Sequence, residues 1–146
     1  MEESPPRILH ASAVACEGRG LLILGRSGSG KSSLALAMMA LGAGLVADDR
    51  TVLRADGGGL VADCPAALRG RIEARGVGIL SARPAGPARL VLAVDLDRPE
   101  PERLPPHRRI ELLGHALPLV LGQGRHHLAP VLLQYLRGGR WDAPEA

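Results

Sequence analysis

The stretch LLILGRSGSGKSSLALAMMAL spans residues 21–41 and decides the local fold. LLIL (21–24) predicts a short buried strand, because four apolar residues follow one another directly after a turn signal. GRSGSG (25–30) predicts a loop, and KSSLALAMMAL (31–41) consists of strong helix formers that end before Gly42. The order of strand, glycine-rich loop and helix fits the pattern G-x-x-x-x-G-K-[ST], which is typical of a phosphate-binding loop.

Lys31 is the only lysine among 18 basic residues. Its place in the motif requires a compact ammonium that reaches the β- and γ-phosphates, whereas an arginine fork is wider and more rigid. The glycines let the backbone turn tightly and point N–H groups inward, and the helix start adds its positive end. Ser32 offers a hydroxyl to Mg²⁺. The predicted nucleotide-binding residues are Gly25, Arg26, Ser27, Gly28, Ser29, Gly30, Lys31, Ser32 and Ser33.

The composition is that of one globular domain, with 146 residues of which 46% are hydrophobic and 23% charged. A net charge of +3, scattered arginines and only one Tyr and one Trp argue against a nucleic-acid partner. The longest apolar run, residues 34–47, contains two glycines and is too short to cross a membrane. The start MEESPPRILH is unlike a signal peptide, and Cys16 and Cys64 form no CxxC motif, so we expect a reduced, cytoplasmic protein.

The rest of the chain predicts an α/β domain with a mixed central sheet and flanking helices. The predicted boundaries are a flexible tail over 1–7, a P-loop kinase-like catalytic domain over 8–137 and a C-terminal tail over 138–146. Residues 98–109 are rich in proline and charge and predict a surface loop, whereas 67–76 is ambiguous between helix and strand. The predicted strands are 8–16, 45–49 with its continuation 51–55, 60–64 as a hairpin partner, and 89–96, and a last helix is predicted over 128–139.

Two apolar strands end in carboxylates that are candidates for magnesium or proton chemistry. The generic second motif of a P-loop enzyme is an apolar strand that ends in Asp, and LVLAVD, which ends in Asp95, fits it. GLVADD ends in the less common pair Asp48-Asp49. Alternation along a strand sends these two side chains to opposite sides, so that one faces the phosphates and the other makes a structural or magnesium-water contact. The pattern alone leaves both strands open.

Several segments in one order make the chain resemble the catalytic domain of HPr kinase/phosphorylase, which phosphorylates a serine of the phosphocarrier protein HPr. His10-Ala11-Ser12 precedes the strand, P-loop and helix, and VADDR follows at the distance typical of the family. IEARGVGIL (72–80) is similar to the family segment I-E-x-R-G-x-G-I, and PERL (101–104) with IELLG (110–114) looks like its late arginine segment. The chain starts shortly before these motifs, so we expect a short form without the N-terminal domain of longer members.

The resemblance implies a role for each matching residue. Lys31 and Ser32 keep their P-loop roles, and Glu73 is a second Mg²⁺ ligand. One of Asp48 and Asp49 takes the proton of the serine hydroxyl, the other orients it together with His10, and Arg103 stabilises the transferring phosphoryl group. Without the resemblance, His10 is a strand-edge residue, and Glu73 and Arg103 are solvated charges.

The resemblance further implies ATP and Mg²⁺, HPr or an HPr-like carrier as partner, and a homo-oligomer, a hexamer in the family. The phosphorylase direction is also implied, although GQGRHHLAP (122–130) departs from the family segment linked to it. Two other functions stay open. One is a small-molecule kinase or nucleotide hydrolase with Asp95 as its magnesium partner, and the other is a nucleotide sensor without enzymatic activity. A chain of this length has little room for a lid and an acceptor pocket, which favours a protein acceptor.

Overall fold

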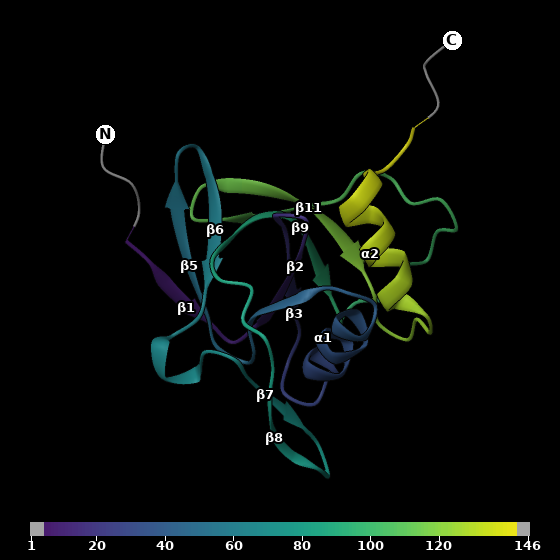
Figure 1. Ribbon diagram of the computed structural model, residues 1–146. Helices are drawn as coiled ribbons and strands as arrows, with labels where there is room; N and C mark the ends of the chain where they lie inside the picture. The colour runs from purple at the N-terminus through teal and green to yellow at the C-terminus, as the bar shows by residue number, and fades with distance from the viewer. Residues whose placement is uncertain (1–4, 143–146) are drawn as a thin grey trace.

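Strand β9 (Ala88–Asp95) lies at the centre of a curled sheet in the computed structural model, which describes residues 5–142 (Figure 1). On one side β9 pairs in parallel with β3 (Arg19–Leu24). On the other side its first residues pair antiparallel with β6 (Gly59–Asp63), and its last residues pair in parallel with β11 (His115–Leu121). The sheet is therefore mixed, which confirms the predicted α/β fold class.

The remaining strands extend this sheet on both sides. Its order is β1-β5-β6-β9-β3-β2-β4, with β10 attached through β11, and β7 and β8 form a separate hairpin. The bounds of these elements are β1 Arg7–Leu9, β2 Ser12–Cys16, β4 Gly44–Ala47, β5 Thr51–Asp56, β7 Arg71–Ala74, β8 Gly78–Ser81 and β10 Arg109–Leu112, with a 3-10 turn at Ala66–Leu68.

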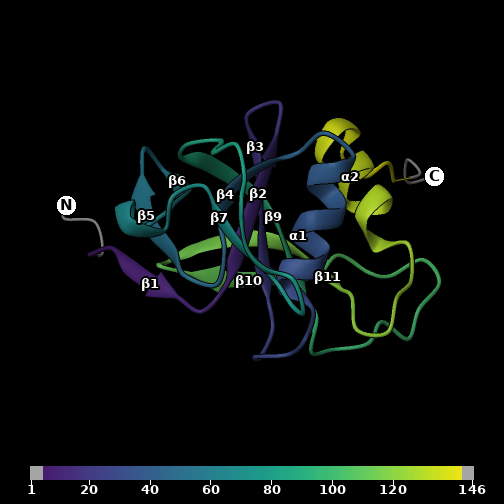
Figure 2. The same cartoon turned by 60° about the horizontal axis from the view of Figure 1, so that its bottom comes forward.

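Helices α1 (Lys31–Ala40) and α2 (Leu128–Gly138) cover one face of the sheet, side by side (Figures 1 and 2). Alternation along β3 explains this layer, because Leu21 and Ile23 point to the helices while Leu22 points to the opposite face. Side chains of both helices are fully buried against the sheet, among them Met38, Leu132 and Leu136. The two predicted helices thus flank the same face.

The opposite face of the sheet is covered by other strands of the same curled sheet. Leu22 of β3 packs there with Leu53 of β5, Leu60 of β6 and Leu119 of β11, which are all buried. β5 and β6 form the left part of the molecule in Figure 1, and the sheet curls so that their buried leucines join the same cluster as Leu22. The absence of Phe in the sequence is matched by a core made of aliphatic side chains.

The structure corrects two predicted strands that read as continuous in the sequence. Residues 8–16 divide into β1 and β2, because β1 pairs with β5 while β2 pairs with β3 and β4. Residues 45–55 divide in the same way, because β4 pairs with β2 and β5 pairs with β1 and β6. The ambiguous segment 67–76 forms the end of the 3-10 turn and then strand β7. The two connections formed in this way, residues 10–11 and 48–50, contain His10, Asp48 and Asp49 of the candidate site.

Most local signals are confirmed. The loop over 25–30 and the helix after it lie where predicted, and Gly57 and Gly58 make the β5–β6 hairpin turn with positive φ values of 61° and 84°. Strands β10 and β11 had no sequence signal, since Pro118 interrupts the second of them and pairs with Arg109 at the sheet edge.

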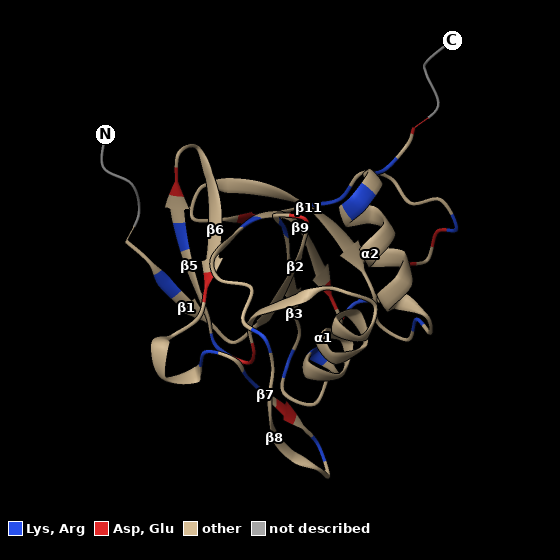
Figure 3. Ribbon diagram, in the orientation of Figure 1, with Lys and Arg blue, Asp and Glu red and all other residues tan. Residues whose placement is uncertain are grey.

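The predicted tails are described only in part. Arg7 already belongs to β1, and residues 1–4 and 143–146 of the two tails lie outside the described part of the chain. Figure 3 shows Lys and Arg spread along many elements rather than gathered on one of them. Over residues 5–142, no helix is both long and apolar enough to cross a membrane.

Candidate active site

The phosphate-binding loop connects the end of β3 to the start of α1, as the motif requires. Gly28 and Gly30 have φ values of +85° and +101°, which side chains disfavour, so the glycines are needed for this turn. Lys31 is only 6% exposed, and its Nζ donates hydrogen bonds to the carbonyl oxygens of Gly25 at 2.7 Å and Arg26 at 3.1 Å. The ammonium therefore lies inside the loop, where a bound phosphate would replace the carbonyls.

A pocket of about 220 Å³ lies beside this loop. It brings together residues from three separate parts of the chain, and four of them have predicted catalytic or metal-binding roles: Lys31, Ser32, Asp49 and Glu73. The other lining residues are Ser27, Gly28, Gly30, Ser33 and Arg75. Lys31, Ser32, Asp49 and Glu73 therefore share one small polar cavity.

His10 and Asp49 meet because two chain connections lie side by side. His10 follows β1 and Asp49 precedes β5, and these strands pair with Leu9 opposite Thr51. Asp49 has a φ of +65°, a left-handed conformation that Asp tolerates better than most residues. Its Oδ1 lies 2.5 Å from His10 Nε2, and both side chains are about half exposed. The pair is accessible from solvent and lies at the edge of the small pocket.

Asp48 has the opposite environment, since it is only 7% exposed. Its Oδ1 accepts hydrogen bonds from the hydroxyls of Ser32 at 2.7 Å and Ser12 at 2.9 Å, and its Oδ2 accepts one from the backbone N–H of Glu73 at 3.0 Å. Ser12, which is fully buried, also accepts a hydrogen bond from the N–H of Asp49. Asp48 thus fixes the P-loop serine and strand β7, while Asp49 faces the pocket.

The oxygen groups of this cavity fit Mg²⁺. Mg²⁺ prefers oxygen ligands, keeps several waters and is bound through one or two carboxylates together with phosphate oxygens. Ser32 and Glu73 supply oxygens beside the P-loop. No group of three or more His, Cys, Asp and Glu side chains that could hold a metal ion gathers in the part of the chain that the structure describes. Ser32 and Glu73 are the residues that would hold the ion.

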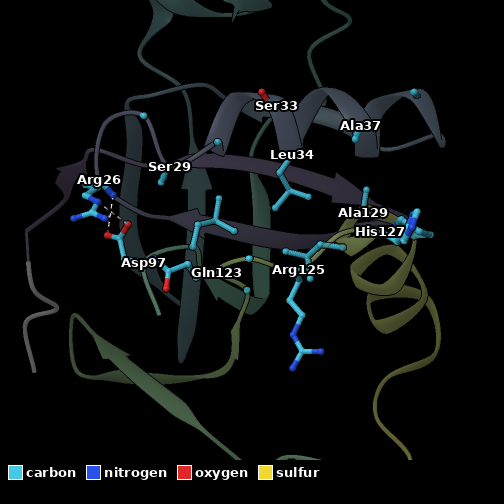
Figure 4. Close-up of a pocket in the computed structure, with 18 of the residues that line it drawn as sticks. Arg26, Ser29, Ser33, Leu34, Ala37, Asp97, Gln123, Arg125, His127 and Ala129 are labelled. Atoms are coloured by element: carbon cyan, nitrogen blue, oxygen red, sulfur yellow. Dashed lines mark hydrogen bonds and ion pairs between the residues drawn. The ribbon is translucent and has the colours of Figure 1, made fainter. Parts of the chain in front are cut away.

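A larger pocket of about 900 Å³ lies on the other side of the P-loop (Figure 4). Leu34 and Ala37 of α1 face Ala129 and the loop that follows β11. Asp97 lies at the border, where its Oδ2 accepts a hydrogen bond from the N–H of Arg26 at 2.9 Å. The P-loop therefore separates two cavities of different character, one small and polar and one larger with apolar walls.

Two predicted candidates lie elsewhere. Asp95 ends β9, and its Oδ1 accepts a hydrogen bond from the N–H of Asp97 at 2.8 Å. Arg103 is exposed in the loop between β9 and β10. Among residues 5–142, Asp95 and Arg103 are not part of the lining of either pocket. Arg75 is the arginine that lines the small pocket, two residues after Glu73.

Sequence reasoning assigned no role to Ser12, Arg75 or Asp97. Ser12 and Arg75 were within the quoted motifs, but a serine in an apolar strand and an arginine in a basic segment carry no chemical signal of their own. Asp97 gains its contact from the turn after β9, which brings it to the P-loop. Only the three-dimensional arrangement identifies these residues.

The loop after β9 is held by an ion pair. Both carboxylate oxygens of Glu100 accept hydrogen bonds from Arg108, at 2.7 Å from Nε and 2.8 Å from Nη2. The hydrogen bond to Arg108 lowers the pKa of Glu100, and the same contact raises the pKa of Arg108. Arg125 donates to the carbonyl oxygen of Glu100 at 3.0 Å, which ties this loop to the loop after β11.

Comparison with known proteins gives consistent similarities. The family model described as the HPr serine kinase C-terminal domain matches residues 2–86, more than half of the chain. A protein named HPr kinase/phosphorylase from Aromatoleum aromaticum is 42% identical over 120 residues, which cover 73% of this chain and 38% of that protein. One of the same name from Exiguobacterium is 42% identical over 81 residues, covering 55% of this chain and 26% of that protein. The chain thus spans well under half the length of these curated relatives.

A solved structure shares the fold over most of the chain. The structure of the Hpr(Ser) kinase/phosphatase from Coxiella burnetii superposes with a TM-score of 0.77 and 27% sequence identity. The match covers 90% of this chain and 88% of that chain.

Proposed function

The chain belongs to the family of HPr serine kinase C-terminal domains, and we propose that it transfers the γ-phosphoryl group of ATP to a serine of HPr or an HPr-like carrier protein. The observation that carries this proposal is the His10–Asp49 pair, in which Asp49 lines the same small pocket as Lys31 and Ser32. A carboxylate beside a phosphate-binding loop is the arrangement that phosphoryl transfer to a hydroxyl requires.

Asp49 is the proposed base. Its side chain is 56% exposed, so a hydroxyl on the surface of another protein reaches it without entering a deep cavity. His10 holds Oδ1, which leaves Oδ2 to accept the proton of the serine hydroxyl. As the serine oxygen bonds to the γ-phosphorus, the bond to the β–γ bridging oxygen breaks and ADP leaves with that electron pair.

Asp48 has a different role in this proposal, because it positions Ser32. Since the Ser32 hydroxyl donates a hydrogen bond to Asp48, the lone pairs of its oxygen stay available to the small pocket. Ser32 and Glu73 would hold Mg²⁺ there, and the bound ion supplies positive charge that stabilises the transferring phosphoryl group. Lys31 adds its ammonium at the same phosphates.

The alternative functions make different use of the carboxylates. A small-molecule kinase or hydrolase of the generic P-loop type would use Asp95, whose Oδ1 binds the N–H of Asp97 in a turn. The position of Asp48 beside Ser32 supports the Asp48–Asp49 pair instead. A nucleotide sensor needs no base, whereas the accessible His10–Asp49 pair supports transfer to an acceptor.

The deciding experiment is incubation of the chain with Mg²⁺, ATP and HPr, followed by intact-mass measurement of HPr. The proposal expects one added phosphate, which is lost in Asp49→Asn while nucleotide binding is retained. Nucleotide binding without phosphate transfer in the wild type would favour the sensor. Phosphate release from phosphorylated HPr, with inorganic phosphate added, tests the reverse reaction. The homo-oligomer that the resemblance implies stays a prediction.

A further inference from the structure

The larger pocket lies at the carboxyl ends of three parallel strands. Leu24 at the end of β3 and Leu121 at the end of β11 are both in register with Asp95 at the end of β9. The loops that follow these level ends supply much of the pocket lining. Ligands of α/β sheets bind outside the carboxyl ends of parallel strands, so this is where the topology predicts a ligand. The volume of about 900 Å³ lies within the usual range of ligand sites, about 300–1,000 Å³.

The P-loop forms a wall shared by both pockets, so that one ligand can occupy both. Ser27, Gly28, Gly30 and Ser33 line the small pocket and the large one. From there the large pocket follows α1 to Leu41 at its far end. The ten residues of α1 span about 15 Å, so the large pocket extends well beyond the P-loop.

The part of the large pocket between the two helices is aliphatic. It is lined by Leu34 and Ala37 of α1 and by Leu41 directly after this helix, spaced three and four residues apart, and by Leu128 and Ala129 at the start of α2. Figure 4 shows Leu34 and Ala37 on the helix above the cavity and Ala129 on the other side of it. A flat base that enters between the two helices is therefore sandwiched by apolar side chains.

From this geometry we propose that the large pocket is the nucleoside subsite and that it holds a purine base by apolar contact, with little discrimination between adenine and guanine. The inference rests on the proposed function, because it assigns the remainder of the nucleotide whose phosphates occupy the P-loop. Neither the family match nor the names of the relatives say where a base lies or how selectively it is bound.

The polar groups of the pocket explain the weak selectivity. The Asp97 carboxylate, an acceptor for the N–H donors of guanine, is engaged by Arg26 on both oxygens: Oδ2 accepts from the N–H of Arg26 at 2.9 Å, and Oδ1 lies 3.7 Å from its Nε. Gln123 carries an amide that donates or accepts according to its orientation. The guanidinium of Arg125 donates to the carbonyl oxygen of Glu100. A site with such adaptable or occupied groups discriminates weakly, unlike a site with fixed hydrogen-bond partners.

One aromatic ring, the imidazole of His127, lines the large pocket, and no Phe, Tyr or Trp of residues 5–142 does. A base therefore meets this ring together with leucine and alanine side chains. Stacking and apolar contact both respond to the area of a base rather than to its edge.

The test blocks the pocket without touching the P-loop. Ala37 and Ala40 line the pocket and are exposed, so Ala37→Phe and Ala40→Phe fill it without disturbing the core. Val131→Phe on α2 is the matched control, because Val131 is 59% exposed and is not among the residues of 5–142 that line the pocket. Titration calorimetry with Mg²⁺ and ATP, GTP or inorganic tripolyphosphate measures the two subsites separately.

We expect ATP and GTP to bind the wild type within about tenfold of each other. Each blocking variant weakens both nucleotides by at least about tenfold, leaves tripolyphosphate unchanged and keeps the wild-type circular dichroism, and the control changes nothing. Unchanged ATP affinity in both blocking variants would refute the subsite, and a preference above about a hundredfold for one base would refute the weak selectivity. A wild type that binds no tripolyphosphate would instead count against the proposed function itself.

Discussion

Replacing Asp48 by asparagine exchanges one carboxylate oxygen for an NH₂ group at a point where all partners are donors. Ser12, Ser32 and the N–H of Glu73 all donate to this carboxylate. If the amide oxygen stays opposite Glu73, the NH₂ group faces the two hydroxyls and forces them to accept. Ser12, which is fully buried and already accepts from the N–H of Asp49, then has no acceptor among these groups for its own proton.

The magnitude follows from these contacts. Hydrogen bonds to a charged group each contribute about 1.5–3 kcal/mol, and an unsatisfied buried donor costs about 1–3 kcal/mol. Because Asn keeps one of the three bonds and reverses the others, we expect Asp48→Asn to lower the free energy of unfolding by about 2–4 kcal/mol. For a chain of this size the melting temperature falls by about 4–16 °C. Asp49→Asn removes only a half-exposed pair with His10, which is worth less than about 1 kcal/mol.

The two variants also separate the two chemical roles. In Asp48→Asn the Ser32 hydroxyl is turned, so the Mg²⁺ concentration for half-maximal phosphorylation of HPr rises. In Asp49→Asn the Mg²⁺ dependence stays, and kcat falls by about 10²–10⁴ because the base is lost. Urea unfolding and initial rates at varied Mg²⁺ measure both effects. Equal loss of stability in the two variants, or a larger loss in Asp49→Asn, would refute the assignment of Asp48 as the positioning carboxylate.

Three further predictions concern the P-loop and the loop after β9. Lys31→Arg weakens tripolyphosphate binding by at least about tenfold, because the loop closes around the ammonium and a guanidinium does not fit; wild-type affinity in a calorimetric titration would contradict this. Ser32→Ala loses phosphorylation activity, and high Mg²⁺ restores part of it, whereas the Lys31 variant gains nothing from added Mg²⁺. Glu100→Gln lowers the melting temperature most at neutral pH. Arg108 lowers the pKa of Glu100, so the stabilisation exists above the ordinary carboxyl pKa and is lost as pH falls through the lowered value; a difference that does not shrink in acid would contradict the ion pair.

The elements that the sequence predicts correctly are those that short-range residue patterns specify. The P-loop, helix α1, the hairpin at Gly57-Gly58 and helix α2 follow from glycines, helix formers and apolar runs. The divisions at residues 10–11 and 48–50 do not, because each segment reads as one apolar strand and is divided only by pairing with different neighbours. These divisions bring His10 to Asp49, so the sequence reveals the residues of the site more readily than their arrangement.

The distinction between Asp48 and Asp49 shows the same limit at the scale of two residues. Strand alternation predicted opposite directions for the two carboxylates, and the structure places one among hydrogen-bond donors and the other in the small pocket. Which carboxylate takes which place depends on the left-handed backbone of Asp49 at φ +65° and on the buried hydroxyl of Ser12. Neither the backbone conformation nor the position of this hydroxyl can be predicted from two adjacent Asp residues in the sequence.

Asp95 differs from Asp48 and Asp49 in its position. It ends β9, which runs parallel to the P-loop strand β3, and this is where a generic P-loop enzyme has its magnesium carboxylate. Here its Oδ1 accepts the N–H of Asp97, whose own carboxylate accepts the N–H of Arg26 in the P-loop. An asparagine oxygen accepts the same bond, so Asp95→Asn should change stability by less than about 1 kcal/mol and leave the Mg²⁺ dependence unaltered. Asp95→Ala removes the bond, loosens Asp97 and weakens nucleotide binding, again without a change in Mg²⁺ dependence. Initial rates of phosphorylation at varied Mg²⁺ distinguish the two candidate metal sites. A tenfold or larger rise in the half-maximal Mg²⁺ concentration for Asp95→Asn, with Asp48→Asn unaffected, would place the metal site at the end of β9. This result would favour the generic P-loop enzyme.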